Sequence, residues 1–208
     1  MLTIYGRANS INVRKVLWLC DELELAYGRE DWGQGFRDPN DPEYLALNPN
    51  GLVPTIRDGD FTMWESDAIV RYLAQREGRD DLYPAEPRKR AIVEQWMNWY
   101  GTGFGQSFRY AFHALIRRNP AFADQGRIDS SLRACAGRVA ILDAHLAAAG
   151  GPYVAGADLT LADILMGAGV NRWMHMPADK PPCPAVAAYY ERLSARPAYA
   201  KWFNADNP

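Results

Sequence analysis

The chain has 208 residues, of which 48% are hydrophobic and 23% are charged, and its formal net charge is −2 at pH 7. This composition is that of an ordinary soluble globular protein, and the length suits one large domain or two small ones. The sequence has no run or stripe of Lys and Arg, the usual sign of a protein that binds nucleic acid, so we expect no nucleic-acid partner. No apolar stretch is long enough to span a bilayer, and residues 1–7 lack the pattern of a signal peptide, so we expect no membrane partner.

The cysteines and histidines argue against a disulfide framework and against a metal site. An odd and scattered set of three cysteines, none in a Cys-x-x-Cys pair, is typical of a protein kept in a reducing cytoplasm. The three histidines share no metal-ligand spacing, so we expect no metal. The residues concerned are Cys20, Cys135, Cys183, His113, His145 and His175.

The first part of the chain alternates short strands and helices. Residues 2–5 have the pattern of a strand that Gly6 closes, and apolar residues from Ser10 to Glu24 recur at helical spacing on one face. Less regular segments follow: a weak strand within 26–32, an irregular loop over 33–42 and a short helix over 43–47.

A β-hairpin and a closing helix complete this part. Residues 55–57 and 61–64 flank Asp58-Gly59-Asp60, and Asp-Gly between two apolar runs is a strong hairpin signal. A helix then starts near Ser66. We therefore expect a compact α/β domain over residues 1–77, followed by a linker over 78–88 that is rich in charges, Gly and Pro.

The remainder, residues 89–208, shows helical patterns and no convincing strand. Thr160 and Asp163 resemble a capping box at a helix start, and Gly150-Gly151-Pro152 is a helix stop. The expected helices cover 91–113, 130–149, a segment that starts at Thr160, and 184–193 as the last helix. The fold class is therefore an α/β domain followed by an all-α domain.

Two short runs, 47–56 and 64–69, lie one hairpin apart and together suggest a clamp for a peptide ligand. A cis bond at Val53-Pro54 would turn the Val53 backbone outward, where its N–H and C=O could pair with an extended ligand. Alone, Pro54 is better explained as an ordinary loop proline. Ser66 is a good helix cap, and the free N–H groups of a helix start favour a ligand carboxylate, while Glu65 could accept from a ligand ammonium. An ordinary cap beside a solvated Glu65 is the alternative.

Ser10 and Asn12 open the first predicted helix. Either Asn9 or Ser10 could serve only as an N-cap. Alternatively, the Ser10 hydroxyl could donate to a ligand thiolate, with the Asn12 amide nearby. A thiol has a pKa of about 8.5, so making the thiolate dominant at neutral pH takes about 3 kcal/mol. A hydrogen bond to a charged group contributes about 1.5–3 kcal/mol and a helix start about 0.3–1 kcal/mol, so no general base is needed.

Taken in order, these motifs resemble those of the cytosolic glutathione transferases over nearly the whole chain. Segment 10–16 resembles the part that carries the catalytic Ser or Thr in serine-type, theta-, phi- and nu-like bacterial members. Segment 48–54 resembles the loop that ends in the cis-proline, and 65–66 resembles the pair that binds the γ-glutamyl group. Segment 156–163 resembles the capping box and staple of the family.

The resemblance implies a thioredoxin-like N-terminal domain and a helical C-terminal domain that contributes the electrophile site. It implies a cytoplasmic homodimer in detoxification, with glutathione as co-substrate and no metal. Ser10 and Asn12 would be catalytic, and Val53, Pro54, Glu65 and Ser66 would bind glutathione. Many relatives have Gln or Lys where Leu52 stands, so the glycyl end lacks an obvious partner; Arg37 and Asn40 are the candidates in the preceding loop.

The first helix of the C-terminal domain is rich in aromatic residues. In the family the second substrate lies against this helix, and Tyr100, Phe104 and Phe108 are our candidates for the electrophile pocket. An aromatic stripe at helical spacing is more often core. The glycines in 101–105 do not form a nucleotide loop, because no strand precedes them, and they predict a bend or local opening of the helix.

Three functions fit these residues. The first is a glutathione transferase that adds the thiolate to a small hydrophobic electrophile. The second is a glutathione-dependent peroxidase or disulfide reductase, because Ser10 and Asn12 resemble the Thr/Asn pair of bacterial relatives with that activity. The third is a non-catalytic interaction module, which would commonly have lost parts of the clamp that this chain retains.

Overall fold

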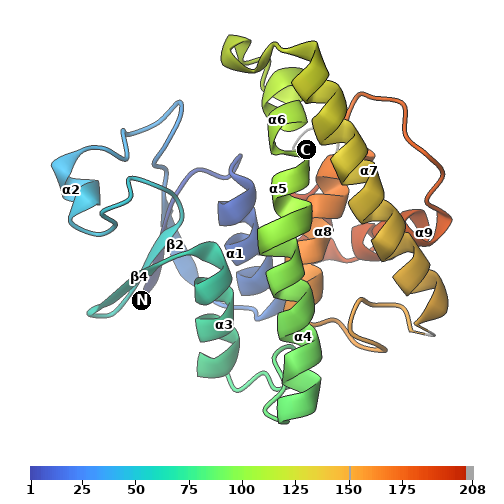
Figure 1. The fold of residues 1–208 in the computed structure, drawn as a ribbon. Coiled ribbons are helices and arrows are strands. Elements are labelled where there is room, and N and C mark those ends of the chain that lie inside the picture. The colour runs from blue at the N-terminus through green and yellow to red at the C-terminus, as the bar shows by residue number, and fades with distance from the viewer. Residues whose placement is uncertain (150, 205–208) are drawn as a thin grey trace. The chain divides into compact units, whose positions relative to one another are not determined.

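The computed structural model describes residues 1–149 and 151–204. The chain divides into two compact units, Met1–Asp80 and Asp81–Pro208, and the division falls inside the segment 78–88 that the sequence marks as a linker. The first unit contains a β-sheet with helices, and the described part of the second unit is helical (Figure 1). The predicted fold class, an α/β domain followed by an all-α domain, is confirmed.

The first unit is built on a four-stranded sheet in the order β2-β1-β3-β4. β1 runs parallel to β2 and antiparallel to β3, and β3 pairs antiparallel with β4. Helices α1 and α3 pack against one another on one face of the sheet, and α2 lies on the other side (Figure 1). The elements are β1 Leu2–Tyr5, α1 Ile11–Glu22, β2 Tyr27–Glu30, α2 Pro42–Leu45, β3 Thr55–Asp58, β4 Phe61–Trp64 and α3 Ser66–Arg76.

The apolar face of α1 forms much of the core of this unit. Val13, Val16 and Leu17 are fully buried, as their helical spacing predicts. The same helix also buries Arg14 and Lys15, whose charges the hydrophobic pattern does not explain. The predicted hairpin is present, and Gly59 adopts a φ of +63° in its two-residue turn, a conformation that glycine adopts readily.

The described residues of the second unit form a series of helical segments. Its first part changes helix type several times and the later helices are regular. The segments are α4 Pro87–Trp99, η1 Tyr100–Phe104, α5 Gly105–Ser107, α6 Arg109–Ala111, η2 Phe112–Ile116, η3 Pro120–Phe122, α7 Gln125–Ala148, α8 Leu161–Met174, α9 Pro184–Ser194 and α10 Pro197–Trp202.

The predicted local opening near the glycines of 101–105 is confirmed. The backbone of η1 is π-helical, and a second π-helical stretch, η2, lies further along. Gly169 of α8 explains how closely the rings of η1 pack, because a Cβ at this position would lie 2.8 Å from Phe104 Cε1 and 2.8 Å from Tyr100 Cε2. Glycine here permits close packing between η1 and α8.

Several helix boundaries differ from the prediction, and α4, for example, begins at Pro87 instead of 91. α7 begins at Gln125 instead of 130, because the Asp124 side chain accepts from the Arg127 backbone N–H at 2.9 Å and caps the helix. The helix 184–193 is not the last one, because Pro197 starts α10. Proline is well suited to the first position of a helix, where its missing N–H would have no partner.

The predicted capping box at Thr160 and Asp163 is confirmed. The buried Asp163 carboxylate accepts from the Thr160 N–H at 2.8 Å and from the Val154 N–H at 2.9 Å, and Tyr189 Oη donates to it at 2.9 Å. One carboxylate thus joins the start of α8 to the preceding loop and to α9. The expected helix stop at Gly150-Gly151-Pro152 lies partly outside the described residues, and α7 ends at Ala148.

Candidate functional site

A polar pocket opens in the first unit where three segments meet. The segments are the start of α1, the loop between α2 and β3, and the junction of β4 with α3. The cavity has a volume of about 40 Å³. Its lining residues are Asn12, Asn48, Asn50, Leu52, Val53, Pro54, Glu65 and Ser66. Five residues from the predicted site, Asn12, Val53, Pro54, Glu65 and Ser66, are therefore brought together.

The loop before β3 is held by hydrogen bonds to one carbonyl. The Leu52 C=O accepts from Tyr44 Oη at 2.6 Å and from Asn48 Nδ2 at 2.8 Å. Asn48 Oδ1 in turn accepts from the Asn50 N–H at 3.0 Å, which fixes the turn itself. Burial raises the pKa of Tyr44, which keeps its hydroxyl protonated as the donor in this network.

The Val53-Pro54 bond is cis, as the resemblance to the family implied, and Pro54 is not an ordinary loop proline. The Val53 side chain packs against a buried cluster of Tyr5, Trp32 and Tyr44. Within the described chain, neither the N–H nor the C=O of Val53 has a hydrogen-bond partner. Packing therefore fixes the Val53 side chain, while its backbone N–H and C=O remain available to a ligand at the pocket.

The junction of β4 with α3 has an unusual backbone. Glu65 has φ +73° and ψ 107°, outside the regions that non-glycine residues favour, at a typical cost of about 1–3 kcal/mol. Glu65 occupies the N-cap position of α3, and its exposed side chain has no partner among the described residues. Ser66 is the first helical residue, so the expectation that Ser66 caps the helix was wrong. Its hydroxyl instead donates to Asp67 Oδ1 at 3.1 Å.

Ser10 occupies the N-cap position of α1. Its side chain makes no capping hydrogen bond, and within residues 1–149 and 151–204 the hydroxyl has no other partner. Its N–H donates to the Arg7 C=O at 3.1 Å, which closes the loop after β1. Ser10 itself does not line the pocket, but Asn12, in the first turn of α1, does.

Gly6 links the Ser10 loop to the clamp. It has a φ of +151°, and a Cβ at this position would lie 2.6 Å from Val13 Cγ2 and 3.1 Å from Val53 Cβ. The end of β1, the first turn of α1 and Val53 therefore touch one another. This contact fixes the loop that carries Ser10 against the loop that carries Val53.

Arg37 and Asn40, the candidates for the glycyl end of glutathione, are not among the residues that line the pocket. The Arg37 guanidinium stacks over Trp32 at 3.8 Å from the ring centroid and forms ion pairs with Glu30 and Glu43. Asn40 donates to Asp38 Oδ1 at 2.9 Å, and its Oδ1 would lie 3.0 Å from a Cβ at Gly51. Both side chains thus have structural partners, and their contact with a ligand stays a prediction.

The three aromatic candidates are packed in the second unit. Tyr100, Phe104 and Phe108 are at most 5% exposed, and successive rings meet edge to face. In the described chain they are part of a core, which is the more common role of such a stripe. Their assignment to an electrophile pocket stays a prediction.

Cys20 is unsuited to attack a ligand in this structure. It is fully buried on α1, and burial raises the pKa of its thiol to about 12, so the reactive thiolate is scarce at neutral pH. In the described part of the chain, no group of three or more His, Cys, Asp or Glu side chains could hold a metal ion. None of the described helices is both long and apolar enough to cross a membrane.

Sequence reasoning missed Asn48 and Asn50 as pocket residues. Their part in the site depends on the hydrogen bonds of Asn48 to Leu52 and Asn50. The available signal was the run 47–54, since Asn accepts and donates within tight turns. It also missed Tyr44, whose helix is marked by Asp41 as N-cap and by Pro42 at its first position.

Comparisons with known proteins agree with this geometry. The glutathione S-transferase N-terminal domain family matches residues 9–76, and the glutathione S-transferase C-terminal domain family matches residues 134–206. Glutathione S-transferase GstB of Escherichia coli (strain K12) is 38% identical over 203 residues, which are 97% of both chains.

Solved structures of glutathione transferases are also similar to this chain. A theta class glutathione S-transferase from Xanthomonas axonopodis pv. citri, with glutathione bound, has a TM-score of 0.91 and 41% identity and covers 97% of this chain and 96% of its own. Glutathione transferase F7 from Populus trichocarpa has a TM-score of 0.85 and 27% identity, with 97% of each chain covered.

The chain therefore belongs to the cytosolic glutathione S-transferase family. It is by this membership a glutathione S-transferase enzyme, with the thioredoxin-like first domain and helical second domain that the sequence predicted.

Proposed function

We propose that this protein binds glutathione in the pocket of the first unit, activates the thiol through Ser10 and conjugates it to a small hydrophobic electrophile. The observation that carries the proposal is the pocket itself. It joins an available backbone donor and acceptor at Val53, a carboxylate at Glu65 and the start of α3. The similar Xanthomonas enzyme has a solved structure with glutathione bound.

The cysteinyl and γ-glutamyl parts of glutathione each have a suitable partner in this arrangement. The cysteinyl backbone pairs with the N–H and C=O of Val53 in the manner of a short antiparallel strand. The ammonium of the γ-glutamyl group pairs with the Glu65 carboxylate, and its carboxylate accepts from the first N–H groups of α3. These contacts orient the peptide and place its central thiol toward the start of α1.

Ser10 then holds the sulfur as a thiolate. Its hydroxyl, which has no partner in the described chain, donates to the sulfur, and the start of α1 adds a favourable potential. The thiol proton passes to solvent. The sulfur lone pair forms the new bond to the electrophilic carbon, and the leaving group departs with its electron pair. Asn12 lines the same pocket and its amide is the second donor near the sulfur.

The role of Ser10 is tested by titrating bound glutathione through its ultraviolet thiolate absorbance. Loss of one hydrogen bond to a charged group costs about 1.5–3 kcal/mol, so Ser10→Ala is expected to raise the pKa of the bound thiol by about 1–2 units. The value of kcat/KM at pH 7 should fall by about 10–100-fold.

Ser130→Ala is a matched control, because Ser130 is exposed on α7 and does not line the pocket. It should leave both quantities unchanged. An unchanged thiol pKa in Ser10→Ala, with glutathione still bound, would exclude the proposed role of Ser10.

Asn12 supports a second candidate reaction, because it lines the pocket and, with Ser10, resembles the Thr/Asn pair of bacterial relatives that reduce peroxides and disulfides. There the bound thiolate attacks a disulfide sulfur and releases the other thiol as thiolate. A second glutathione then reduces the mixed disulfide and leaves glutathione disulfide. Turnover of a chloronitrobenzene compared with a small disulfide separates this reaction from conjugation.

The family resemblance adds a homodimeric state, a cytoplasmic location and a role in detoxification to the proposal. Size-exclusion chromatography with light scattering tests the dimer: a mass near 23.4 kDa, that of one chain, would contradict it. A panel of electrophiles tests the preference for small hydrophobic substrates. Cell fractionation tests the location.

A further inference from the structure

An ion pair between the buried Lys15 and the partly exposed Asp67 lies next to the pocket-lining residue Ser66. Lys15 of α1 is 2% exposed, and its Nζ lies 2.5 Å from Asp67 Oδ1. Asp67 is the second residue of α3, next to Ser66, which lines the pocket. A buried ammonium is costly unless it is paired, so the partner of Lys15 is part of what holds α1 against α3.

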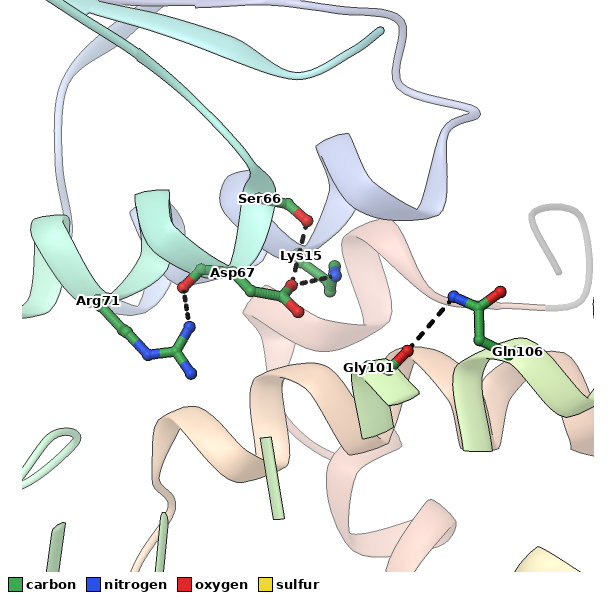
Figure 2. A network of polar contacts seen from close by, with 6 residues as sticks. All are labelled: Lys15, Ser66, Asp67, Arg71, Gly101 and Gln106. Carbon is green, nitrogen blue, oxygen red and sulfur yellow. Dashed lines mark hydrogen bonds and ion pairs between the residues drawn. The ribbon is translucent and has the colours of Figure 1, made fainter. Parts of the chain in front are cut away.

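The same carboxylate oxygen also holds Ser66. Asp67 Oδ1 accepts from Ser66 Oγ at 3.1 Å and from Lys15 Nζ, as Figure 2 shows. Arg71 Nη1 donates to the Asp67 backbone C=O at 2.7 Å, one turn further along the helix. The remaining hydrogen bond in Figure 2, from Gln106 to the Gly101 C=O, lies within the second unit.

We propose that Lys15 is a positioning residue for the γ-glutamyl head group of glutathione, acting through Asp67. This inference rests on the proposed function. A ligand carboxylate at the start of α3 would meet the Asp67 carboxylate beside it, and like charges at this range repel. Lys15 neutralises Asp67, so the first N–H groups of α3 keep their positive potential for the ligand. Asp67 meanwhile fixes the Ser66 hydroxyl at the pocket wall.

Two single variants are expected to act differently. Lys15→Met keeps the apolar stem but leaves Asp67 charged, so the Kd and KM for glutathione should rise about tenfold, with kcat unchanged. Asp67→Asn removes the repelling charge and keeps an acceptor for Ser66, so its KM should not exceed that of the wild type. Binding is measured by calorimetry and KM by steady-state kinetics.

The double variant Lys15→Met/Asp67→Asn provides the decisive comparison. It contains no buried unpaired charge at this site, so it should fold even if Lys15→Met does not, and it should regain the Kd of the wild type. A double variant that folds but binds as weakly as Lys15→Met, or single variants that weaken binding equally, would overturn the proposal.

Arg76→Met is the matched control. Arg76 ends the same helix and forms an ion pair with Asp58 at 2.5 Å, away from the pocket lining. Its loss should lower stability in urea without changing KM. Cysteinylglycine, a thiol substrate without the γ-glutamyl group, should show no difference between the wild type and Lys15→Met.

The two proposals fail in different ways. If the wild-type protein does not bind glutathione in the calorimeter, the proposed function fails. If the wild type binds glutathione and Lys15→Met binds it equally well, the proposed function stands and only the role of Lys15 is excluded.

Discussion

Gly6 shows how a single residue can join two parts of the site. Its φ of +151° and its contacts with Val13 and Val53 leave no room for a side chain. A Cβ at 2.6 Å from Val13 Cγ2 forces one of these neighbours to move. The position of Val53, and with it the backbone that is proposed to pair with glutathione, therefore depends on the absence of a side chain at position 6.

We predict that Gly6→Ala lowers the free energy of unfolding by about 1–3 kcal/mol, through crowding and an unfavourable φ. It should also raise the Kd for glutathione, since Val53 must shift. Urea unfolding and calorimetry measure the two effects. Gly59→Ala is the control, because Gly59 also has a positive φ, +63°, but no neighbour within 4 Å. If both variants changed the Kd equally, crowding of Val53 would not be the cause.

The residues of the pocket were predictable where a local motif carries them. Val53, Pro54, Glu65 and Ser66 lie in two short runs, and Asn12 lies at a recognisable helix start. The proposed role of Lys15 was not predictable, because it depends on Asp67, 52 positions away in the sequence. Arg37 was chosen by its place in the loop to which the family resemblance points, and the sequence does not show that Glu30, Glu43 and Trp32 surround it.

At the scale of elements, Asp58 ties the end of β3 to α3. Its carboxylate accepts from Arg76 Nη1 at 2.5 Å and from Tyr72 Oη at 2.7 Å. These two hydrogen bonds, that of Arg76 first, hold the pKa of Asp58 below its usual value. The folded protein thus binds a proton at Asp58 less readily than the unfolded chain. The resulting stabilisation is present above the unfolded pKa and is lost as the pH falls through the folded pKa.

We predict that Asp58→Asn lowers the free energy of unfolding at pH 7 by about 1 kcal/mol, the typical net value of such a partly exposed, charged hydrogen bond. The difference from the wild type should shrink as the pH is lowered below about 4, where the unfolded carboxylate becomes protonated. Urea unfolding at several pH values measures this. Asp60→Asn, in the exposed turn of the same hairpin, should show no such difference, and an equal effect at every pH would contradict the assignment.

The elements themselves were largely predictable from periodicity and turn residues, as α1 and the β3–β4 hairpin show. The errors occurred where two local signals compete. The helix 184–193 was taken as the last one although Pro197 starts another, and Ser66 was taken as a cap although Glu65 occupies that position. Deciding between such alternatives requires the tertiary contacts that follow, which a local pattern does not contain.

At the scale of the whole molecule, the described pocket lies entirely within the first unit, and the second unit contains its own core around Tyr100, Phe104 and Gly169. The resemblance to the family predicted this order of domains, because motifs from both units occur in one sequence. The electrophile site could not be predicted with the same precision, since the candidate rings are also the residues that fill a core.

We predict that Gly169→Ala lowers the stability of the protein by about 1–3 kcal/mol, because the new methyl group would overlap both Phe104 and Tyr100. The Kd for glutathione should not change, since Gly169 belongs to the second unit. Thermal unfolding and calorimetry test this. Gly137→Ala is the control: Gly137 is also helical, has no neighbour within 4 Å and should gain up to about 1 kcal/mol from helix propensity.

The π-helical stretches η1 and η2 have a consequence for how this part of the chain can vary. A π-helical turn holds one residue more than an α-helical turn between hydrogen-bonded groups. A one-residue deletion within Tyr100–Phe104 or Phe112–Ile116 can therefore be absorbed where it occurs, because it converts the π-helical turn into an α-helical one. The same change inside Pro87–Trp99 would rotate all later side chains by about 100° about the helix axis. The aromatic segment thus has two positions where its length can change during evolution while the helices around it keep their register.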